Sequence, residues 1–185
     1  MRRNETTTRI EVHQGTGTRY HSLLYRPDGA VVALDGGGYN RIGGPVDRVP
    51  HDVAHHVVEH RLGLDAGLWG VLAAGGIVQN ATFAGGRRPP HALRRAAAVT
   101  DAAGESLRQA EILVRAVADL TLTRDDPPNA AAFRAAVGER WWTPVATAEA
   151  LGLACTDLLA AAVRWQALDP GDAFPLAWPM RPLSR

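Results

Sequence analysis

Three strand-like segments at the start of the chain are joined by connections so short that they allow only antiparallel pairing. Residues 8–13 alternate between polar and apolar side chains, and residues 19–25 are rich in aromatic and β-forming residues. Residues 26–29 read Arg-Pro-Asp-Gly, a turn in which proline presets φ and glycine adopts a positive φ, and the apolar run at residues 30–34 follows as a third strand. Such an antiparallel meander has one face that other elements must cover.

Helical patterns supply the elements that can cover this sheet. Residues 50–62 predict a helix rich in histidine, and an apolar stripe over residues 92–121 predicts a long helix that Gly104 weakens. We therefore predict an α+β fold: a small antiparallel sheet of three or more strands, covered by these helices, with a C-terminal helical lobe. For residues 75–88 two interpretations are open, a strand at residues 77–78 followed by a loop, or irregular structure throughout.

A linker at residues 123–129 divides the chain into two parts. Residues 1–122 form the α+β core with the histidine-rich helix, and residues 123–185 form the helical lobe and a proline-rich tail. We expect the two parts to fold as one cooperative domain. Four prolines follow Asp169, so the tail is expected to wrap over the surface without regular structure. Helices of the lobe are expected at residues 130–139, 147–151 and 155–168.

Composition narrows the class of protein. Hydrophobic residues make up 46% and charged residues 21% of the 185 positions, which is ordinary for a globular protein. The net charge of +1 gives no field that would attract nucleic acid, so a nucleic-acid partner is not expected. No apolar run reaches the roughly 20 residues that span a bilayer, so a membrane partner is not expected either. The single cysteine rules out an intramolecular disulfide and favours a reducing, cytoplasmic location.

Residue types that are missing argue against several catalytic mechanisms. All twenty basic residues are arginine, which excludes a lysine Schiff base, a lysine general base and a phosphate-loop lysine. Serine occurs only at positions 22, 106 and 184, and none lies in the Gly-x-Ser-x-Gly motif of serine hydrolases. Cys155 has apolar neighbours and is interpreted as a buried structural thiol. The histidine-rich helix is left as the main candidate for chemistry.

A helical wheel divides the side chains of this helix. Its apolar arc, which is expected to face the sheet, consists of Val53, Ala54, Val57, Val58 and Leu62. Its polar side, which is expected to face solvent, carries Asp52, His56 and Glu59. His51 and His55 lie at one margin of the apolar arc, where a pocket between core and solvent is expected, and His60 lies near the other margin.

Residues 51–55, His-Asp-Val-Ala-His, resemble the His-Glu-x-x-His motif of zinc metalloproteases, with aspartate in place of glutamate. The resemblance implies that His51 and His55, one helical turn apart, bind a single Zn²⁺ or another divalent metal. It also implies that Asp52 polarises the metal-bound water in a metal-assisted hydrolysis. Aspartate is one methylene shorter than glutamate, which shortens the reach of Asp52 toward that water.

The motif has no third ligand at a recognisable position. Glu59 lies two turns beyond His51, about 12 Å along the helix axis, which is too far to share one ion with both histidines. We interpret Glu59 either as a hydrogen-bond partner behind His55 or as a surface carboxylate. Side chains that could approach from other elements are His13, His21, His91 and Glu111. Of the acids, Glu111 is the better placed, near the margin of the apolar stripe of its helix.

Two other interpretations of the histidine-rich helix stay open. In metal-free acid–base catalysis, Asp52 orients His55 or His56, and the imidazole titrates near neutral pH. In a purely structural interpretation, His51 and His55 are hydrogen-bonded residues at the edge of the core, and His56 and His60 lie on the surface.

A glycine-rich loop at residues 35–44 precedes this helix. If the loop cradles an anion, Tyr39, Arg41 and Arg48 are candidates for binding the substrate. The loop matches neither the dinucleotide-binding nor the phosphate-loop pattern, which favours a simple connector. A mobile lid over the adjacent site is a third interpretation.

A segment near the C-terminus suggests a function of a different class. Ala148, Gly152 and Leu158 resemble the spacing of a helix-turn-helix, with a small residue, a turn glycine and an apolar anchor. Residues 155–166, which would be the reading helix, offer few groups that can read bases. The leading hypothesis is therefore an enzyme that acts on a small-molecule or peptide substrate, and the alternative is a non-catalytic ligand-binding or regulatory protein. A homo-oligomer is compatible with both.

Overall fold

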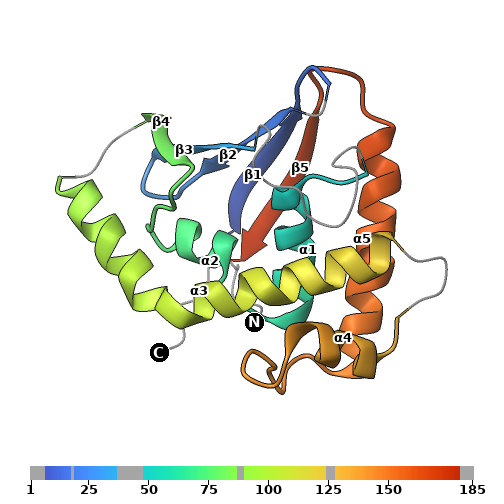
Figure 1. Cartoon of the computed structure of the whole chain (residues 1–185). Helices are drawn as coiled ribbons and strands as arrows, with labels where there is room; N and C mark the ends of the chain where they lie inside the picture. The colour runs from blue at the N-terminus through green and yellow to red at the C-terminus, as the bar shows by residue number, and fades with distance from the viewer. Residues whose placement is uncertain (1–6, 18, 37–47, 87–89, 124–127, 180–185) are drawn as a thin grey trace, which may run out of the picture.

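The computed structural model of the chain describes residues 7–17, 19–36, 48–86, 90–123 and 128–179. Five strands form one antiparallel sheet in the order β4-β3-β2-β1-β5 (Figure 1). The strands are β1 Thr7–Gln14, β2 Tyr20–Tyr25, β3 Ala30–Asp35, β4 Ala81–Gly86 and β5 Ala173–Pro179. The helices are α1 His51–Leu62, α2 Leu68–Ala73, α3 Ala92–Leu122, α4 Ala130–Val137 and α5 Ala148–Gln166. The predicted α+β fold is confirmed.

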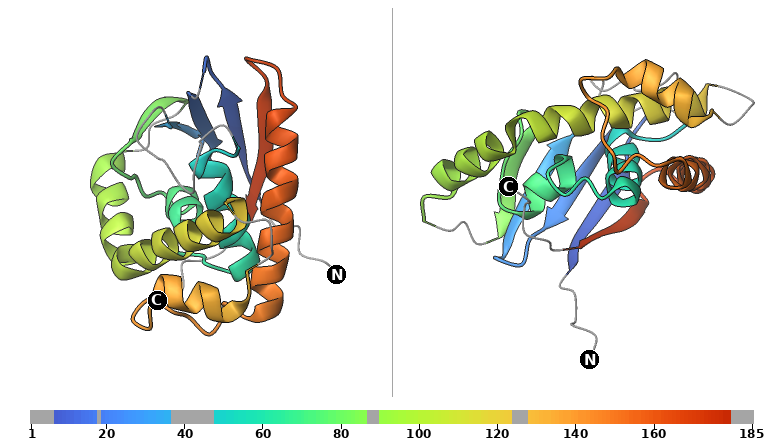
Figure 2. Two further views of the ribbon diagram at one scale, coloured as in Figure 1. Left: turned by 45° about the vertical axis from the view of Figure 1, so that its right-hand side comes forward. Right: turned by 90° about the horizontal axis from the view of Figure 1, so that it is seen from below.

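The helices lie on one side of the sheet in the right-hand view of Figure 2, which is seen from below. In that view, α1 and α2 lie nearest the strands, and α3 lies outside them. Helix α3 packs on α1, α2, α4 and α5, so it covers the sheet through the helices beneath it. None of the described helices combines the length and the apolar character that crossing a bilayer requires.

The predicted meander is confirmed. β2 pairs with β1 on one side and with β3 on the other, and Leu24 lies opposite Val32 in the second of these pairs. Side chains at alternate positions of the three strands are buried toward the helices. In the turn before β3, Gly29 has a φ of 84°, and the Asp28 carboxylate accepts a hydrogen bond from the backbone nitrogen of Ala30 at 3.1 Å. The local turn chemistry therefore sets the pairing of these strands.

The two edge strands correct the sequence-based predictions. Neither interpretation of residues 75–88 is right, because the strand in this region is residues 81–86. The prediction of an irregular tail is wrong for residues 173–179, since these form β5 and pair with β1 from Thr7 to His13. Residues 180–185 lie outside the described residues. Phe174 and Trp178 of β5 are buried in the core. The stability gained from burying these side chains outweighs the preference of the neighbouring prolines for irregular structure. Pro175 is tolerated because β5 pairs on one side only, and an edge strand needs no donor on its other side.

Helix α5 runs without a break from Ala148 to Gln166. The predicted turn at Gly152 is therefore wrong, and with it the helix-turn-helix interpretation of this segment. The Thr147 side chain caps the helix by accepting a hydrogen bond from the backbone nitrogen of Ala150 at 3.1 Å. Glycine inside a helix costs about 1 kcal/mol relative to alanine, a cost that the packing of the buried face of α5 outweighs.

One hydrophobic cluster includes side chains from both parts of the chain. Ile10 and Val53 come from the first part, and Leu158 and Trp178 come from the second. Because β5 belongs to the same sheet as β1, the last strand of the chain is also part of this core. The division at residues 122 and 123 stays a prediction, and the shared core favours cooperative unfolding of the two parts.

We predict that Leu158→Ala lowers the free energy of unfolding by about 2–5 kcal/mol, because truncating a fully buried leucine leaves a cavity. Leu159→Ala is the matched control, since the neighbouring side chain is 46% exposed and its truncation should change stability by no more than about 0.5 kcal/mol. Urea unfolding followed by circular dichroism measures both variants. Equal losses in the two would contradict the orientation of α5.

Candidate functional site

Helix α1 is packed on several sides, which buries polar side chains as well as its apolar arc. It lies between the sheet and α3 and also packs against α5. As a result, Asp52 is 1% exposed and Glu59 is 0% exposed, so the prediction that they face solvent is wrong. The helical wheel treated the side with Asp52 and Glu59 as open to solvent, whereas Asp52 packs against the sheet and Glu59 packs against the start of α2. His60 is exposed as predicted, and His56 is only partly exposed.

The imidazole of His55 lies between two carboxylates. Its Nδ1 donates to Oε1 of Glu59 at 2.7 Å, one turn further along α1, and its Nε2 donates to Oε2 of Glu111 on α3 at 3.0 Å. Burial by itself would lower the pKa of His55, but the hydrogen bonds to Glu111 and Glu59 outweigh it and raise that pKa to about 9. At neutral pH and without a metal, His55 is therefore a buried cation that connects α1 with α3.

Glu59 is the buried acceptor behind His55. Besides the imidazole, its Oε1 accepts from the backbone nitrogen of Leu68 at 2.6 Å, and its Oε2 accepts from that of Trp69 at 3.1 Å. These two residues begin α2. A Cβ at Gly67 would lie 2.3 Å from the Glu59 carboxylate, so glycine is required for this close approach. The interpretation of Glu59 as a partner of His55 is confirmed, and its interpretation as a surface carboxylate is wrong.

His51 stacks on His55, with the ring centroids 4.3 Å apart. Its Nε2 lies 3.6 Å from Oε2 of Glu111, and its buried Nδ1 has no hydrogen-bond partner among the described residues. Burial, followed by the charge on His55, lowers the pKa of His51 to about 3. The contact with Glu111 therefore joins a neutral ring to a carboxylate and is not a full ion pair. A neutral imidazole is the form in which histidine binds metals.

His51, His55 and Glu111 form a group with the geometry of an incomplete metal site. One ligand atom from each lies within 4.8 Å of the other two. Donor atoms around tetrahedral zinc are about 3.3–3.6 Å apart, as follows from metal–ligand bonds near 2.0–2.2 Å. Side-chain movements of about an ångström would therefore close this group around an ion. Glu111 is the acid that the sequence favoured as the third ligand.

The other histidines considered as third ligands lie elsewhere. His13 and His21 stack on each other across β1 and β2, with ring centroids 4.8 Å apart, and His13 lies 3.4 Å from Glu11. His91 is the residue that precedes the first turn of α3. Within the described part of the chain, none of these three belongs to a group that could hold a metal ion.

Asp52 connects α1 with the sheet. Its Oδ2 accepts from the Ser22 hydroxyl at 2.6 Å and its Oδ1 from the Tyr20 hydroxyl at 3.4 Å, while its backbone carbonyl accepts from Nε1 of Trp69 at 2.8 Å. Burial raises the pKa of Asp52, and the hydrogen bond from Ser22 opposes that rise. Ser22 is a polar residue at an inward position of β2, which is the signal in the sequence that could have revealed this partner.

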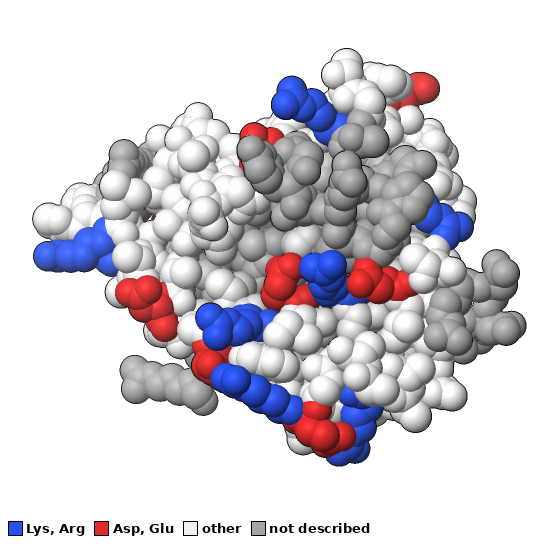
Figure 3. Space-filling view, viewed as in Figure 1, with Lys and Arg blue, Asp and Glu red and all other residues white. Residues whose placement is uncertain are grey.

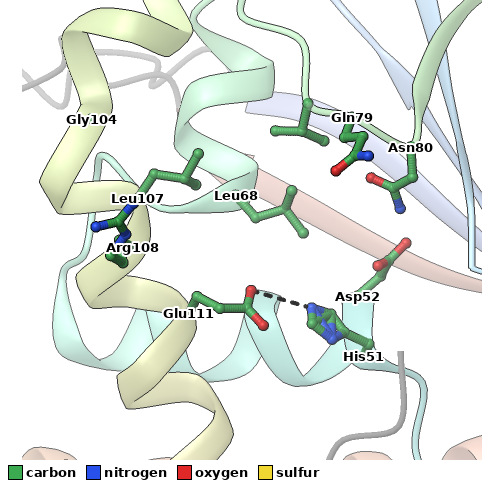
Figure 4. Close-up of a pocket in the computed structure, with 10 residues that line it drawn as sticks. His51, Asp52, Leu68, Gln79, Asn80, Gly104, Leu107, Arg108 and Glu111 are labelled. Atoms are coloured by element: carbon green, nitrogen blue, oxygen red, sulfur yellow. Dashed lines mark ion pairs between the residues drawn. The ribbon is translucent and has the colours of Figure 1, made fainter. Parts of the chain in front are cut away.

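A pocket of about 710 Å³ lies beside His51, Asp52 and Glu111, and the fully buried His55 is not among its described lining residues (Figure 4). In Figure 4, His51 and Glu111 point toward one another from α1 and α3 at one side of the pocket. The described residues that line it are His51, Asp52, Leu68, Val78, Gln79, Asn80, Gly104, Leu107, Arg108 and Glu111. Sequence reasoning missed seven of these ten residues as site residues, because they come from α2, its connection to β4, and α3, which only the tertiary fold brings to α1.

Of the three residues proposed to bind substrate, only Arg48 is among the described residues. Tyr39 and Arg41 lie outside the described residues, so their proposed role stays a prediction. Arg48 donates a hydrogen bond to the backbone carbonyl of Leu122 at the end of α3. Because Arg48 does not line the pocket, its contact with the last turn of α3 is better explained as a helix-terminus interaction.

No protein-family model matches the chain, and searches of curated proteins and of solved structures found no similar protein. The chemistry of the site is therefore inferred from its own geometry.

We predict that the metal-free protein loses stability between about pH 6.5 and pH 9 because of His55. The folded-state pKa of about 9 exceeds the ordinary value of 6.5, so the contribution of protonated His55 is complete below pH 6.5 and is lost as the pH rises through 9. A shift of this size corresponds to about 3 kcal/mol. Urea unfolding at a series of pH values, in the presence of a chelator, measures the loss.

His55→Gln is the control for this pH dependence, because the amide cannot titrate. We expect a flatter stability profile for this variant over the same window. A wild-type free energy of unfolding that stays constant from pH 6.5 to pH 9 would contradict the charged state assigned to His55.

Proposed function

We propose that the protein is a metal-dependent hydrolase that holds Zn²⁺, or another divalent metal, through His51, His55 and Glu111. The observation that carries this proposal is the convergence of these side chains from two helices beside a pocket of about 710 Å³. Imidazole nitrogens and a carboxylate oxygen are ligands typical of zinc. Three protein ligands leave a fourth position open, which is characteristic of catalytic rather than structural zinc sites.

The environment of His55 supports the assignment. Metal-binding histidines usually donate their second ring N–H to a carboxylate or a carbonyl, which fixes the tautomer and the orientation of the ring. Glu59 accepts from Nδ1 of His55 at 2.7 Å, and this hydrogen bond leaves Nε2 to face the metal. The proton that Nε2 shares with Glu111 occupies the place that the ion would take. Metal binding would then release this proton.

Bound zinc would supply a Lewis acid and lower the pKa of a coordinated water. Asp52 is the residue proposed to accept the proton of that water, since it follows His51 directly and lines the same pocket. Its pKa is raised by burial, which favours a role as a base. The Ser22 hydroxyl holds its Oδ2 at 2.6 Å, so the sheet determines where this shorter carboxylate points.

The pocket suits a small molecule or a short peptide better than a folded protein. Its volume lies in the range of small-molecule sites. Leu68, Val78 and Leu107 supply apolar lining, and the side chains of Gln79 and Asn80 supply amide groups. We therefore propose a substrate that combines an apolar group with a polar, hydrolysable bond.

Metal-free acid–base catalysis is the second candidate, because the raised pKa of His55 would make it a proton donor. The version that uses His56 has less support, since Nε2 of His56 donates to the backbone carbonyl of Ala177 at 3.0 Å. A nucleic-acid-binding regulator has less support still. On the face seen in Figure 3, arginine side chains lie among aspartate and glutamate and do not form a continuous basic surface.

We predict that the protein, prepared without a histidine tag, binds Zn²⁺ with a stoichiometry of one. His51→Ala and Glu111→Ala should each weaken zinc binding by more than about 10-fold, because each removes a proposed ligand. His60→Ala is the control, as an exposed histidine of the same helix, and should bind zinc like the wild type. Elemental analysis after dialysis measures the zinc content. Absence of zinc from the wild type, or full retention in both ligand variants, would contradict the metal site.

We also predict that Asp52→Asn keeps zinc but lowers hydrolysis by about 10²- to 10⁴-fold, since the amide cannot accept a proton. The rate is measured on a panel of small esters and N-acylated dipeptides, and zinc content is measured on the same sample. Asp157→Asn is the control, because this carboxylate binds Arg61 at the surface. An Asp52→Asn variant as active as the wild type would refute the proposed role of Asp52.

A further inference from the structure

The outward face of α5 is apolar although no described element packs on it. Leu153 is 45% exposed, Leu159 is 46% exposed and Val163 is 68% exposed. Five large hydrophobic side chains are strongly exposed in the described part of the chain, and these three all belong to α5. The opposite face of α5 is fully engaged, because Leu151, Leu158 and Trp165 are buried in the core. The concentration of exposed apolar groups on one helix, with Leu153 and Val163 on the same side of it, suggests an interface.

The exposed positions of α5 have the spacing of a helix–helix contact. Alternate steps of four and three residues lead from position 149 through 153, 156, 160 and 163 to 167, and all six positions are exposed. Their side chains, here called the outer stripe, are Glu149, Leu153, Thr156, Ala160, Val163 and Ala167. This alternation of four and three is the repeat with which two helices keep one face in contact over several turns.

We propose that the outer stripe binds the outer stripe of a second copy of this chain, with the two α5 helices antiparallel. A two-fold axis that passes between Thr156 and Asp157 places Leu153 opposite Ala160 of the second copy. The same axis places Glu149 opposite Arg164 of the second copy. Each contact then occurs twice, as a two-fold interface requires.

Charge and size complementarity support the antiparallel pair. Glu149 lies in the first turn of α5 and Arg164 in the last turn, and both side chains are exposed. Antiparallel packing joins these opposite charges at both ends of the interface, whereas parallel packing would place like charges together. In the middle, the small side chain of Ala160 leaves room for the larger side chain of Leu153. Arg164 also lies over the Phe174 ring of the same copy, 4.4 Å from its centroid.

The position of the outer stripe allows association without closing the candidate site. In the right-hand view of Figure 2, α5 is seen end-on at the edge of the molecule. None of the outer-stripe residues lines the pocket, which is formed by α1, α2, α3 and the connection to β4. Dimer formation is therefore independent of metal binding, and each copy would keep an open pocket.

Sedimentation velocity of the full chain, from about 1 to 100 µM, tests the proposal. The expected result is a concentration-dependent dimer whose dissociation constant rises at least about 10-fold in Leu153→Glu, which puts a charge within the stripe about one turn from the two-fold axis. Leu93→Glu is the matched control on α3, where the side chain is 56% exposed, and it should leave the dimer unchanged. A monomeric wild type over the whole range would overturn the proposal, as would equal effects of the two variants.

The register is tested by exchanging the charges. Glu149→Arg alone and Arg164→Glu alone should each weaken the dimer, because each brings like charges together at both ends of the interface. The double variant restores opposite charges and should recover the wild-type dissociation constant to within about 3-fold. A double variant as weak as the single ones would rule out the antiparallel register. Circular dichroism spectra that match the wild type establish that the variants are folded.

Discussion

A carboxylate that is buried away from water must accept hydrogen bonds from donors of its own protein. Glu59 accepts three such hydrogen bonds. One donor is the imidazole of His55, and the other two are the backbone nitrogens of Leu68 and Trp69 that begin α2. Through these contacts a single side chain fixes the ring of His55 and the position of the next helix. The other nitrogen of His55 then reaches Glu111, so the alignment of α1, α2 and α3 around the pocket depends on this buried charge. Removing one partner from such a network typically costs about 3–5 kcal/mol.

The fold could be predicted wherever local signals agree with tertiary packing. The meander follows from alternation and from the turn at residues 26–29, and α1, α3 and α4 follow from helical periodicity. The edge strand β5 could not be predicted, because Pro175 and Pro179 favour irregular structure and only pairing with β1 overrides them. The turn predicted at Gly152 was wrong for a similar reason, because tertiary packing overrides a local preference. A glycine on the exposed side of a helix weakens it without breaking it when the other side is buried.

The residues that come together in the candidate site were predictable, whereas their environment was less so. The spacing of His51 and His55 and the position of Glu111 on the margin of its stripe are local properties, so the sequence carries them. The burial of Asp52 and Glu59 is a tertiary property, because it depends on surfaces that cover α1 from several sides. The connection between α2 and β4 contributes Gln79 and Asn80 to the pocket, and no periodicity relates such a segment to a helix far from it in the chain.

Glu111 belongs to a different helix from the two histidines and is separated from His55 by 56 residues of chain. An ion held by all three would therefore act as a cross-link that closes a long loop, which includes α2, β4 and the bend of α3 at Gly104. Because such an ion binds the folded chain only, a free concentration of a hundred times its dissociation constant would add about 2.7 kcal/mol to stability. Glu111 is half-exposed, so the proposed cross-link would be accessible from solvent. The concentration of available metal would then determine how stably α3 is held against α1 beside the pocket. A more stable contact would lengthen the lifetime of the folded chain.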